Sequence, residues 1–365
     1  STEMLLAFNN TDVAVTDPTT GNPVVVYAKD NAPYIARQLS TGAWSSTALP
    51  LHVVGGTTTK VSLVTVGTSL VAGWAETSGP SHLSPGRASV VISRSLDGGA
   101  TWEIPVEATA APVEADSVTL QEIEIVSAGT TGRAVGVSWI ERSRVKYAQC
   151  HGRGTNPMIC AASHSLDDGV GTSGEVSLFG DGSLLLHAVW ESDRSGDPEL
   201  RISSSANGGV AWTGDSLLAP AGATHSDVYN SPSGCIAGSG RLWLGYQTEG
   251  SAYLAHSDDS GVSFTFDQTL GPGLFVQPEC VDSTLAIGWE HFQGSQLVDT
   301  NKTVGLTVSL DDLATQEGPH AMPNSEAAFS RVMTSIALSQ QRLDVFWIKI
   351  DGQDRHLQHR GATLP

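Results

Sequence analysis

Residues 95–102 read SLDGGATW, and this short phrase returns along the chain. Residues 205–212 read SANGGVAW and residues 257–264 read SDDSGVSF, while residues 309–313 (SLDDL) and 39–44 (LSTGAW) are weaker copies. The Asp or Asn at positions 97, 207, 259 and 311 are 110, 52 and 52 residues apart, so the first interval holds about two periods. A unit of this length that repeats along a chain indicates a propeller or a solenoid.

The residue types in this phrase predict a tight turn. An Asp or Asn side chain can accept hydrogen bonds from nearby backbone N–H groups, and the glycines that follow allow a positive φ at little cost. The aromatic residue at the end of each copy is expected to begin the next strand and to cover the turn. We therefore interpret six residues as structural: Asp97, Trp102, Asn207, Trp212, Asp259 and Phe264.

The phrase resembles the Asp-box, or bacterial neuraminidase repeat (S-x-D-x-G-x-T-W), which is shared by sialidases and many other secreted β-propellers. The resemblance implies a propeller with these turns on one face and a ligand site on the opposite face. It says more about the fold than about a reaction, because such a turn is a structural device that serves unrelated functions.

A second repeat predicts the number of blades. Seven apolar runs end in a large aromatic residue, at residues 23–27, 70–74, 135–139, 186–190, 243–246, 285–289 and 343–347. Short runs of this composition between Gly, Ser, Asp and Pro are typical of strands in an all-β chain. We expect each run to be the second strand of a four-stranded antiparallel blade, so that residues 1–365 form a single seven-bladed β-propeller domain.

The N-terminal segment is expected to complete the last blade. The final unit ends with little sequence for a fourth strand, and residues 4–8 (MLLAF) form a spare strand-like piece within residues 1–10. If this piece becomes the outer strand of the last blade, it closes the ring and removes exposed strand edges.

The composition limits the choice of partners. The chain has 38 acidic and 19 basic residues and a net charge of −19, which argues against nucleic acid because such binding needs clustered Lys and Arg. No apolar run reaches the roughly 18 residues that would predict membrane insertion. The acidic balance is compatible with Ca²⁺, with a cationic partner, or with solubility alone.

The four cysteines permit two disulfides. Cys150 and Cys160 flank a short connection, and Cys235 and Cys280 occupy similar positions on adjacent inner strands, where a bridge is possible if the Cα atoms lie close together. Four buried free thiols are the alternative. Disulfides would place the protein outside the cytoplasm, in an extracellular or periplasmic location, and a chain that begins at Ser1 is compatible with export and processing.

An acidic residue follows the second-strand aromatic at nearly the same place in most blades. Four of these carboxylates are candidates for a Ca²⁺-binding rim: Glu76, Glu141, Glu191 and Glu290. The alternative is a structural role, in which each carboxylate accepts hydrogen bonds from the backbone of the next blade. We favour the structural role because a feature repeated in every blade usually serves every blade.

The Asp-box resemblance raises the possibility of a sialidase, which implies an arginine clamp for a carboxylate and a Tyr–Glu nucleophile pair. The sequence lacks the R-I-P phrase that normally carries the first arginine, and sialidase domains have six blades. Guanidinium groups can still bind a carboxylate through paired hydrogen bonds, and four arginines could do so: Arg142, Arg144, Arg194 and Arg331. Tyr229 with Glu279 or Glu191 could imitate the nucleophile pair.

A polysaccharide lyase is a second enzymatic interpretation. Some seven-bladed propellers cleave uronate polymers with His and Tyr as base and acid, and an Arg that neutralises the carboxylate. His can take up and release a proton near neutral pH with little tuning. Four residues fall in suitable loops: His225, Tyr229, Arg194 and His291. A platform for stacking against a sugar ring would have to come from Trp243, Tyr229, Phe275 or Phe292, since the other tryptophans belong to the repeats.

These observations lead to two functional hypotheses. The first is a secreted, non-catalytic propeller that binds a glycan or a protein partner through the face opposite the turns. The alternative is a carbohydrate-active enzyme for acidic sugars, a lyase before a sialidase-like hydrolase. The candidate ligand-binding residues are Arg142, Arg144, Arg194, Tyr229, Glu279, His291 and Arg331.

Overall fold

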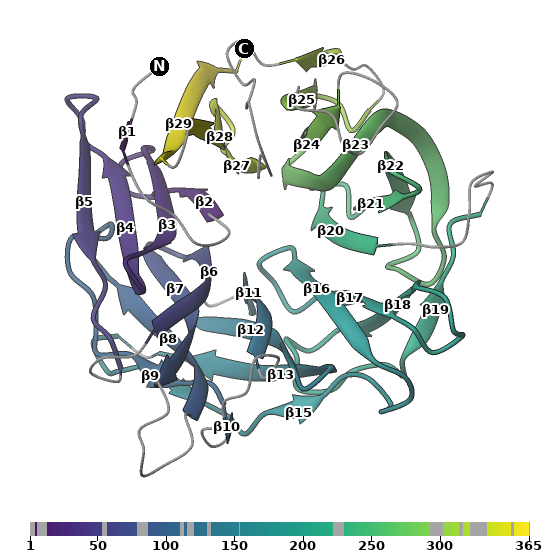
Figure 1. Ribbon diagram of the computed structural model, residues 1–365, viewed down its shortest axis with the longest axis horizontal. Coiled ribbons are helices and arrows are strands. Elements are labelled where there is room, and N and C mark those ends of the chain that lie inside the picture. Colours follow the sequence, from purple (N-terminus) through teal and green to yellow (C-terminus); the bar gives the residue numbers. More distant parts are fainter. Residues whose placement is uncertain are drawn as a thin grey trace. The chain divides into compact units, whose positions relative to one another are not determined.

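The computed structural model describes residues 4–5, 13–52, 57–78, 87–109, 113–114, 120–129, 133–152, 154–221, 230–292, 302–313, 317–321, 334–351 and 354–364. These residues form 29 β-strands and no helix, so the all-β prediction is confirmed for this part of the chain (Figure 1). The fold is a β-propeller of antiparallel sheets. By contacts, the chain divides into two compact units, residues 8–190 with 203–216 and residues 1–7, 191–202 and 217–365.

Three sheets lie in the first unit, and each is an antiparallel meander. One contains β2 (Val13–Thr16), β3 (Pro23–Lys29), β4 (Ala32–Gln38) and β5 (Trp44–Ala48). The next contains β6 (Thr57–Val66), β7 (Ser69–Ser78), β8 (Arg87–Ser95), β9 (Val106–Glu107) and β10 (Val113–Glu114). The third contains β11 (Leu120–Ser127), β12 (Ala134–Glu141), β13 (Arg144–His151), β14 (Ile159–Cys160) and β15 (His164–Ser165).

Three further sheets follow along the chain. A four-stranded sheet contains β16 (Ser173–Gly180), β17 (Leu186–Ser192), β18 (Glu199–Ser205) and β19 (Ser216–Leu218). A seven-stranded sheet contains β20 (Asn230–Ile236), β21 (Leu242–Thr248), β22 (Ser251–Ser257), β23 (Thr265–Val281), β24 (Thr284–Phe292), β25 (Lys302–Ser309) and β26 (Glu317–Ala321). The last contains β27 (Thr334–Leu338), β28 (Arg342–Asp351), β29 (Asp354–Thr363) and β1 (Met4–Leu5).

The structure therefore has six blades, and the prediction of seven is wrong. All seven apolar runs do lie in a strand with a neighbour on each side, but two of them share one sheet. The cause is β23, a 17-residue strand that pairs with β22 through its first part and with β24 through its second part. Gly271-Pro272-Gly273 within it has the composition of a turn, yet the chain continues as a strand.

The N-terminal strand joins the last blade as predicted. Met4 pairs with Leu357 and Leu5 with His356, so that β1 is the edge strand next to β29. Of the predicted residues 4–8, residues 6–8 lie outside the described part of the chain.

Tryptophan forms much of the core of the blades. The side chains of Trp74, Trp139, Trp190, Trp243 and Trp289 are all less than 2% exposed. A buried aromatic ring removes about 150–250 Å² of surface from water, and each of these rings lies on a strand with a neighbour on both sides. These five tryptophans pack inside the sheets, whereas Trp44, Trp102 and Trp212 of the turn phrases are only partly buried.

The turn phrases share one hydrogen-bonding arrangement. The Ser95 hydroxyl donates to Asp97 Oδ1 (2.8 Å) and accepts from the Gly99 backbone N–H (2.8 Å), and Asp97 Oδ1 accepts from the Thr101 N–H (2.8 Å). The copies at residues 205–212 and 257–264 repeat all three contacts at 2.8–2.9 Å. This confirms the predicted turn, although Trp102 precedes the next strand instead of beginning it.

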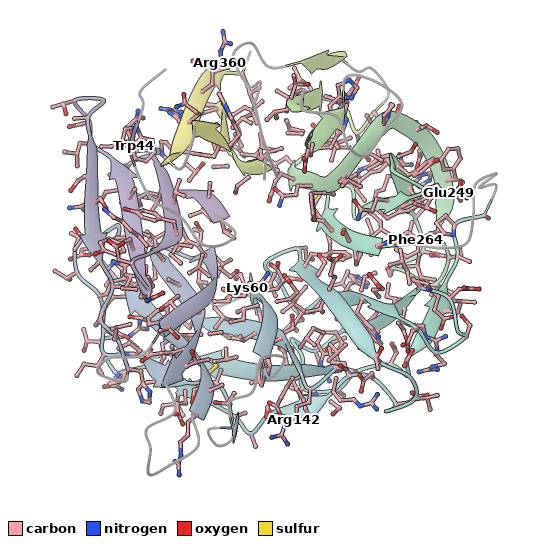
Figure 2. The ribbon with its side chains drawn as sticks, in the orientation of Figure 1. Trp44, Lys60, Arg142, Glu249, Phe264 and Arg360 are labelled. Atoms are coloured by element: carbon pink, nitrogen blue, oxygen red, sulfur yellow. A yellow bond between two sulfur atoms is a disulfide. The ribbon has the colours of Figure 1, made fainter. Side chains whose placement is uncertain are left out.

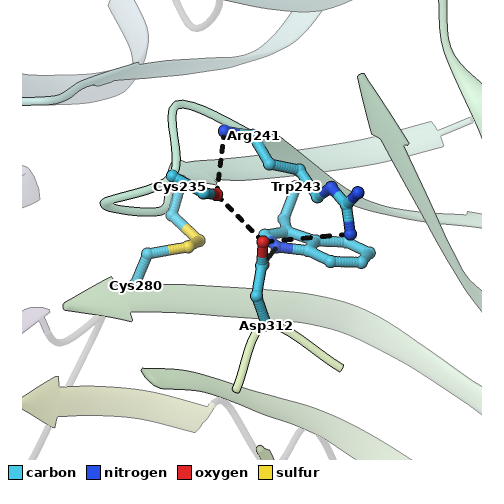
Figure 3. The surroundings of a disulfide bond; sticks show 6 residues. Cys235, Arg241, Trp243, Cys280 and Asp312 are labelled. Carbon is cyan, nitrogen blue, oxygen red and sulfur yellow. Dashed lines mark hydrogen bonds and ion pairs between the residues drawn. A yellow bond between two sulfur atoms is a disulfide. The ribbon is translucent and has the colours of Figure 1, made fainter. Parts of the chain in front are cut away.

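Both predicted disulfides are present. Cys150–Cys160 joins β13 to β14, and Cys235–Cys280 joins β20 to β23. Figure 3 shows the second bridge beside Arg241, Trp243 and Asp312. There the Trp243 indole N–H donates to Asp312 Oδ1 (2.6 Å), and the Arg241 guanidinium lies over the Trp243 ring at 5.5 Å. The bridge therefore lies next to the fourth turn phrase, which contains Asp312.

Candidate functional site

Every meander has two ends with different structures. One end carries the hairpin between the first and second strands and, where the sequence has one, the SxDxG turn. We call it the turn end. The other is the loop end, where the first strand begins and the second strand finishes. In β6 and β7, for example, Val66 pairs with Ser69 at the turn end and Thr57 pairs with Thr77 at the loop end. The resemblance to Asp-box propellers predicts the ligand at the loop end.

The first strands of the first unit are irregular at their loop ends. The pairing of β6 with β7 shifts register between Thr58 and Val61, and that of β11 with β12 shifts between Gln121 and Ile123. Glu122, at the second shift, has a left-handed backbone with φ 40°. Such bulges commonly lie beside active sites, where they re-aim a side chain.

An ion pair connects these two irregular strands. Lys60 Nζ lies 2.7 Å from Glu122 Oε1, and the two side chains are 22% and 29% exposed. In Figure 2 the Lys60 side chain lies beside β6 and β11. The bulge in β11 thus places a carboxylate where it holds an ammonium group at the loop end, and both groups remain accessible to water.

The second unit has the same irregularity in two of its strands. β20 shifts register between Asn230 and Ser233, and β23 shifts between Leu274 and Gln277. Ser231 has φ 48° and Phe275 has φ 52°. The Gln247 side chain on β21 contacts both: its Nε2 donates to Ser231 Oγ (2.8 Å), and its Oε1 accepts from the Phe275 N–H (3.1 Å). One amide therefore fixes two bulges.

Two of the four carboxylates predicted as a Ca²⁺ rim have structural contacts that the structure identifies. Glu76 Oε2 accepts from the Trp74 indole N–H (3.1 Å) and from the His52 backbone N–H (3.1 Å). Glu141 Oε2 accepts from the Trp139 indole (3.2 Å). Glu290 is fully buried and Glu191 is partly exposed. No group of three or more potential metal-binding side chains occurs within the described residues, and Ca²⁺ binding stays a prediction.

Three of the four predicted arginines lie among the described residues, Arg142 and Arg194 in loops at this end and Arg144 at the start of β13. Arg142, in the turn between β12 and β13, is exposed and points away from the sheets in Figure 2. Arg144 Nη1 donates to the Gly171 carbonyl (2.7 Å), and Arg194 follows β17 in a loop. Arg331, His225 and Tyr229 lie outside the described residues. The carboxylate clamp and the Tyr–Glu pair therefore stay predictions.

Glu279 does not lie in a loop leading into a first strand, as the sequence suggested. It is on β23, two residues before the end of that strand, next to Cys280 and therefore near the turn end. The Glu279 side chain is exposed. The surrounding protein nevertheless displaces much of the bulk solvent, and this desolvation raises the pKa of Glu279 to about 7. A carboxyl with such a pKa can exchange protons near neutral pH.

His291 lies at the loop end of β24, where it pairs with Gly273. Its ring meets Trp289 edge-on at 6.3 Å between centroids. The Nδ1 atom is buried without a hydrogen-bond partner among the described residues. A partly exposed histidine with one unsatisfied ring nitrogen can serve as a proton acceptor or as a hydrogen-bonding group for a ligand.

Several residues at the loop end were not among the candidates from sequence. Lys60, Ser231 and Gln247 gave no signal, because a bulge depends on the pairing register of the folded sheet. The contacts of Glu76 and Glu141 had a signal that was missed. Each stands two residues after a tryptophan, and such residues share one face of a strand.

No protein-family model matches the sequence, and no curated protein matches it. Solved structures do resemble the fold. The polysaccharide lyase Uly1 matches with 10% identity and a TM-score of 0.56, over 98% of this chain and 91% of that one. A PL25 ulvan lyase bound to -[GlcA(1-4)Rha3S]- matches with 11% identity and a TM-score of 0.55, over 97% and 95%.

A sialidase of Trypanosoma rangeli also matches, with 11% identity and a TM-score of 0.52 over 98% of this chain. The chain spans only 58% of that sialidase. At such low identity the likeness shows the fold alone: a β-propeller of the kind found in these sialidases and polysaccharide lyases.

Proposed function

We propose that this protein is a glycan-binding propeller that takes its ligand at the loop end of the sheets. The observation that carries the proposal is the set of left-handed residues there, Glu122, Glu175, Ser231 and Phe275, three of which lie at register shifts. Non-glycine residues in this conformation cost roughly 1–3 kcal/mol each and cluster at binding sites. A sheet end that serves only the fold does not need strained residues of this kind.

Comparison with the other propellers supports a saccharide ligand. Polysaccharide lyases match this chain over 91% and 95% of their own length, and one of them is bound to a sulfated glucuronate–rhamnose saccharide. The two disulfides support an extracellular or periplasmic location, where polysaccharides occur. None of the described residues form a helix that could span a membrane.

An acidic glycan would need local cations, because the net charge of −19 repels a polyanion at long range. Three basic residues at the loop end of the first unit can supply them: Lys60, Arg142 and Arg144. Lys60 is held by Glu122 and is 22% exposed, so a sulfate or carboxylate could approach its ammonium group from solvent. We therefore place the anionic groups of the glycan near Lys60.

The test is titration calorimetry with two ligands, a sulfated glucuronate–rhamnose oligosaccharide and a neutral arabino-oligosaccharide. We expect the acidic oligosaccharide to bind, and Lys60→Ala to weaken it severalfold. Arg360→Ala is the matched control, because Arg360 is an exposed cation on β29 (Figure 2). Failure of both ligands to bind would refute the proposal and direct attention to a protein partner.

A polysaccharide lyase is the second candidate, and His291 is the observation that favours it. In such a reaction a base removes the proton at C5 of a uronate. The C4–O bond then breaks, a C4–C5 double bond forms, and the leaving oxygen takes up a proton. His291, whose ring is partly exposed, would be the base. Ultraviolet absorbance of the unsaturated product detects the reaction, and activity that survives His291→Ala would reject this role.

A further inference from the structure

Trp289 has a buried indole N–H with no hydrogen-bond partner among the described residues. In β7 the indole of Trp74 donates to Glu76, two residues further along the strand (3.1 Å), and β12 repeats this contact at 3.2 Å. His291 takes the place of the carboxylate in β24, and its ring meets the indole edge-on at 6.3 Å between centroids. The replacement of a glutamate by a shorter imidazole therefore accounts for the unpaired donor.

Two further buried polar atoms lie on the same face of this sheet. His291 Nδ1 and Thr303 Oγ1 are both buried, and neither has a hydrogen bond within the described part of the chain. His291 stands two residues after Trp289, so both side chains lie on one face of β24. Thr303 on β25 pairs directly with His291, and the Cβ atoms of such a pair are about 5 Å apart on a shared face. The three groups therefore gather at the loop end of one sheet.

Two glycines orient the edge of the indole. A Cβ atom at Gly273 would collide with Trp289 Cδ1 (2.7 Å), and a Cβ atom at Gly305 would collide with Trp289 Cε2. Nε1 is bonded to both of these carbons, so the N–H edge lies between the two glycines. Because Gly273 pairs with His291, this edge adjoins the cross-strand row that holds His291 and Thr303.

The hydrogen-bonding capacities of the three groups match a single water molecule. An indole N–H only donates, a hydroxyl group donates and accepts, and a neutral imidazole donates through one nitrogen and accepts through the other. Buried water in proteins typically makes about three hydrogen bonds to polar groups of this kind. A small anion fits less well, because burial of a lone charge is costly and the net charge of −19 repels anions.

We propose that Trp289, His291 and Thr303 hold one internal water molecule, and that Trp289 and Thr303 thereby act as positioning residues for His291. The water accepts from the Trp289 N–H and from His291 Nδ1–H, and it donates to Thr303 Oγ1. His291 then presents Nε2, which is not among the buried atoms, as an acceptor at the loop end. This inference rests on the lyase reaction given above as the second candidate function, because a base needs a nitrogen that is free to accept a proton.

Ring ¹⁵N NMR tests the tautomer, because the two neutral forms of an imidazole give different nitrogen shifts. His291→Gln identifies the signals of His291 among the 11 histidines. In mildly alkaline buffer we expect the Nδ1–H form in the wild-type protein and a mixture of forms in Thr303→Val, which replaces the hydroxyl with a methyl group. Thr303→Ser should restore the wild-type pattern. An Nε2–H form in the wild-type protein would overturn the inference.

A crystal structure of the wild-type protein gives a check that needs no variant. We expect an ordered water oxygen within about 3.2 Å of Trp289 Nε1, His291 Nδ1 and Thr303 Oγ1. Well-defined density for the three side chains without that oxygen would contradict the proposed site.

The ultraviolet assay with the sulfated glucuronate–rhamnose oligosaccharide measures the consequence for the reaction. Thr303→Val should lower kcat/KM by up to about a hundredfold, because it misplaces the base, and Thr303→Ser should recover most of that loss. Thr307→Val is the matched control. Thr307 is 2% exposed and pairs with Ile287 on the same face of the sheet, so its replacement should leave the reaction and the ring shifts of His291 unchanged.

The outcomes separate this inference from the reaction on which it rests. If the wild-type protein releases no unsaturated product, but His291 carries its proton on Nδ1 and loses that preference in Thr303→Val, the internal site stands and the lyase reaction fails. If the wild-type protein cleaves the oligosaccharide and Thr303→Val matches Thr307→Val in both measurements, the positioning role fails and the reaction stands.

Discussion

The two ends of the sheets contain left-handed residues of different kinds. At the turn end the positive-φ positions of the first two complete turns are glycines: Gly98, Gly99, Gly208 and Gly209. At the loop end, outside the hairpins, they include Glu122, Glu175, Ser231 and Phe275. Glycine accepts a positive φ at little cost, whereas other side chains do not. The turn end is therefore built for stability, and the loop end keeps strained side chains that a purely structural role would not retain.

The third and fourth turns depart from this pattern: Ser260 in the third turn has φ 59°, and the fourth turn has two such residues. Asp312 and Leu313 replace the glycines and have φ of 55° and 66°. Asp312 has compensating contacts that no glycine could make: it accepts from Trp243 Nε1 (2.6 Å) and from Ser239 Oγ (2.9 Å). Strain at the turn end is thus offset by bonds within the fold, while the strained residues at the loop end remain partly accessible.

The largest expected effect comes from the disulfide at the turn end. The Cys235–Cys280 bridge closes 45 residues, and the chain-entropy relation gives about 4 kcal/mol for a loop of that length. Replacing both cysteines with serine should lower the free energy of unfolding by about this amount in denaturant titrations. The matched pair Cys150 and Cys160 closes 10 residues and should cost less, about 3 kcal/mol. Both bridges lie at the turn end, so a reversed order would contradict the loop-closure origin of the difference.

Gly209→Ala should destabilise the protein by about 3 kcal/mol, combining left-handed strain with overpacking. The added methyl group would clash with the Tyr147 hydroxyl, and φ is 88°. Gly182→Ala is the control, because φ is 76° there but no atom lies within 4 Å of the new methyl group. Chemical denaturation should show the larger loss for Gly209. Equal losses would mean that the packing around the turn contributes nothing.

Acid should weaken the third turn more than the second. Hydrogen bonds from the Ser263 hydroxyl and N–H and from Ser257 lower the pKa of Asp259 to about 2. A carboxyl with a lowered pKa adds stability above its ordinary value of 3.8, and this contribution disappears as the pH falls through about 2. Asn207 holds the same place in the second turn without titrating. We expect Asp259→Asn to flatten the stability profile between these pH values, and an unchanged profile would refute the assignment.

The smallest expected effect is at the loop end. Glu175 has φ 30° and is partly exposed. Glu175→Gly should raise the free energy of unfolding by at most about 1 kcal/mol, because relief of backbone strain exceeds the added flexibility of the unfolded chain. Denaturant titration measures this change. A clear loss of stability would show that Glu175 serves the fold, and would weaken the contrast between the two ends.

Much of the fold could be predicted from the sequence because its signals are local. The turn phrase carries its own hydrogen-bonding groups, the seven apolar runs carry their own strand pattern, and the Cys235–Cys280 bridge followed from matching positions in neighbouring repeats. The blade count failed at Gly271-Pro272-Gly273, where residues typical of a turn remain extended within β23. Pairing on both sides of the strand decided that outcome, and no local signal reports it.

The candidate site was less accessible to sequence reasoning. The predicted arginines and His291 were placed at the loop end by strand order alone. The contacts of Gln247 depend on the register of β20 and β23, because that register sets the positions of Ser231 and Phe275. The sequence alone does not show this register. Glu279 was misplaced because β23 extends further than the repeat suggested. A binding site made from strand irregularities depends on tertiary pairing, which a single sequence does not display.

The continuity of β23 also bears on how such a protein can be rearranged. Propellers built from separate blades can gain or lose a whole unit by duplication or deletion at the seams between blades. Residues 230–321 offer no seam, because the shared strand belongs to two meanders at once. A circular permutation that opens the chain at Gly271 would cut a paired strand, whereas one that opens it in the turn at Gly182 would not. We therefore expect these two meanders to be duplicated, deleted or engineered as a single unit.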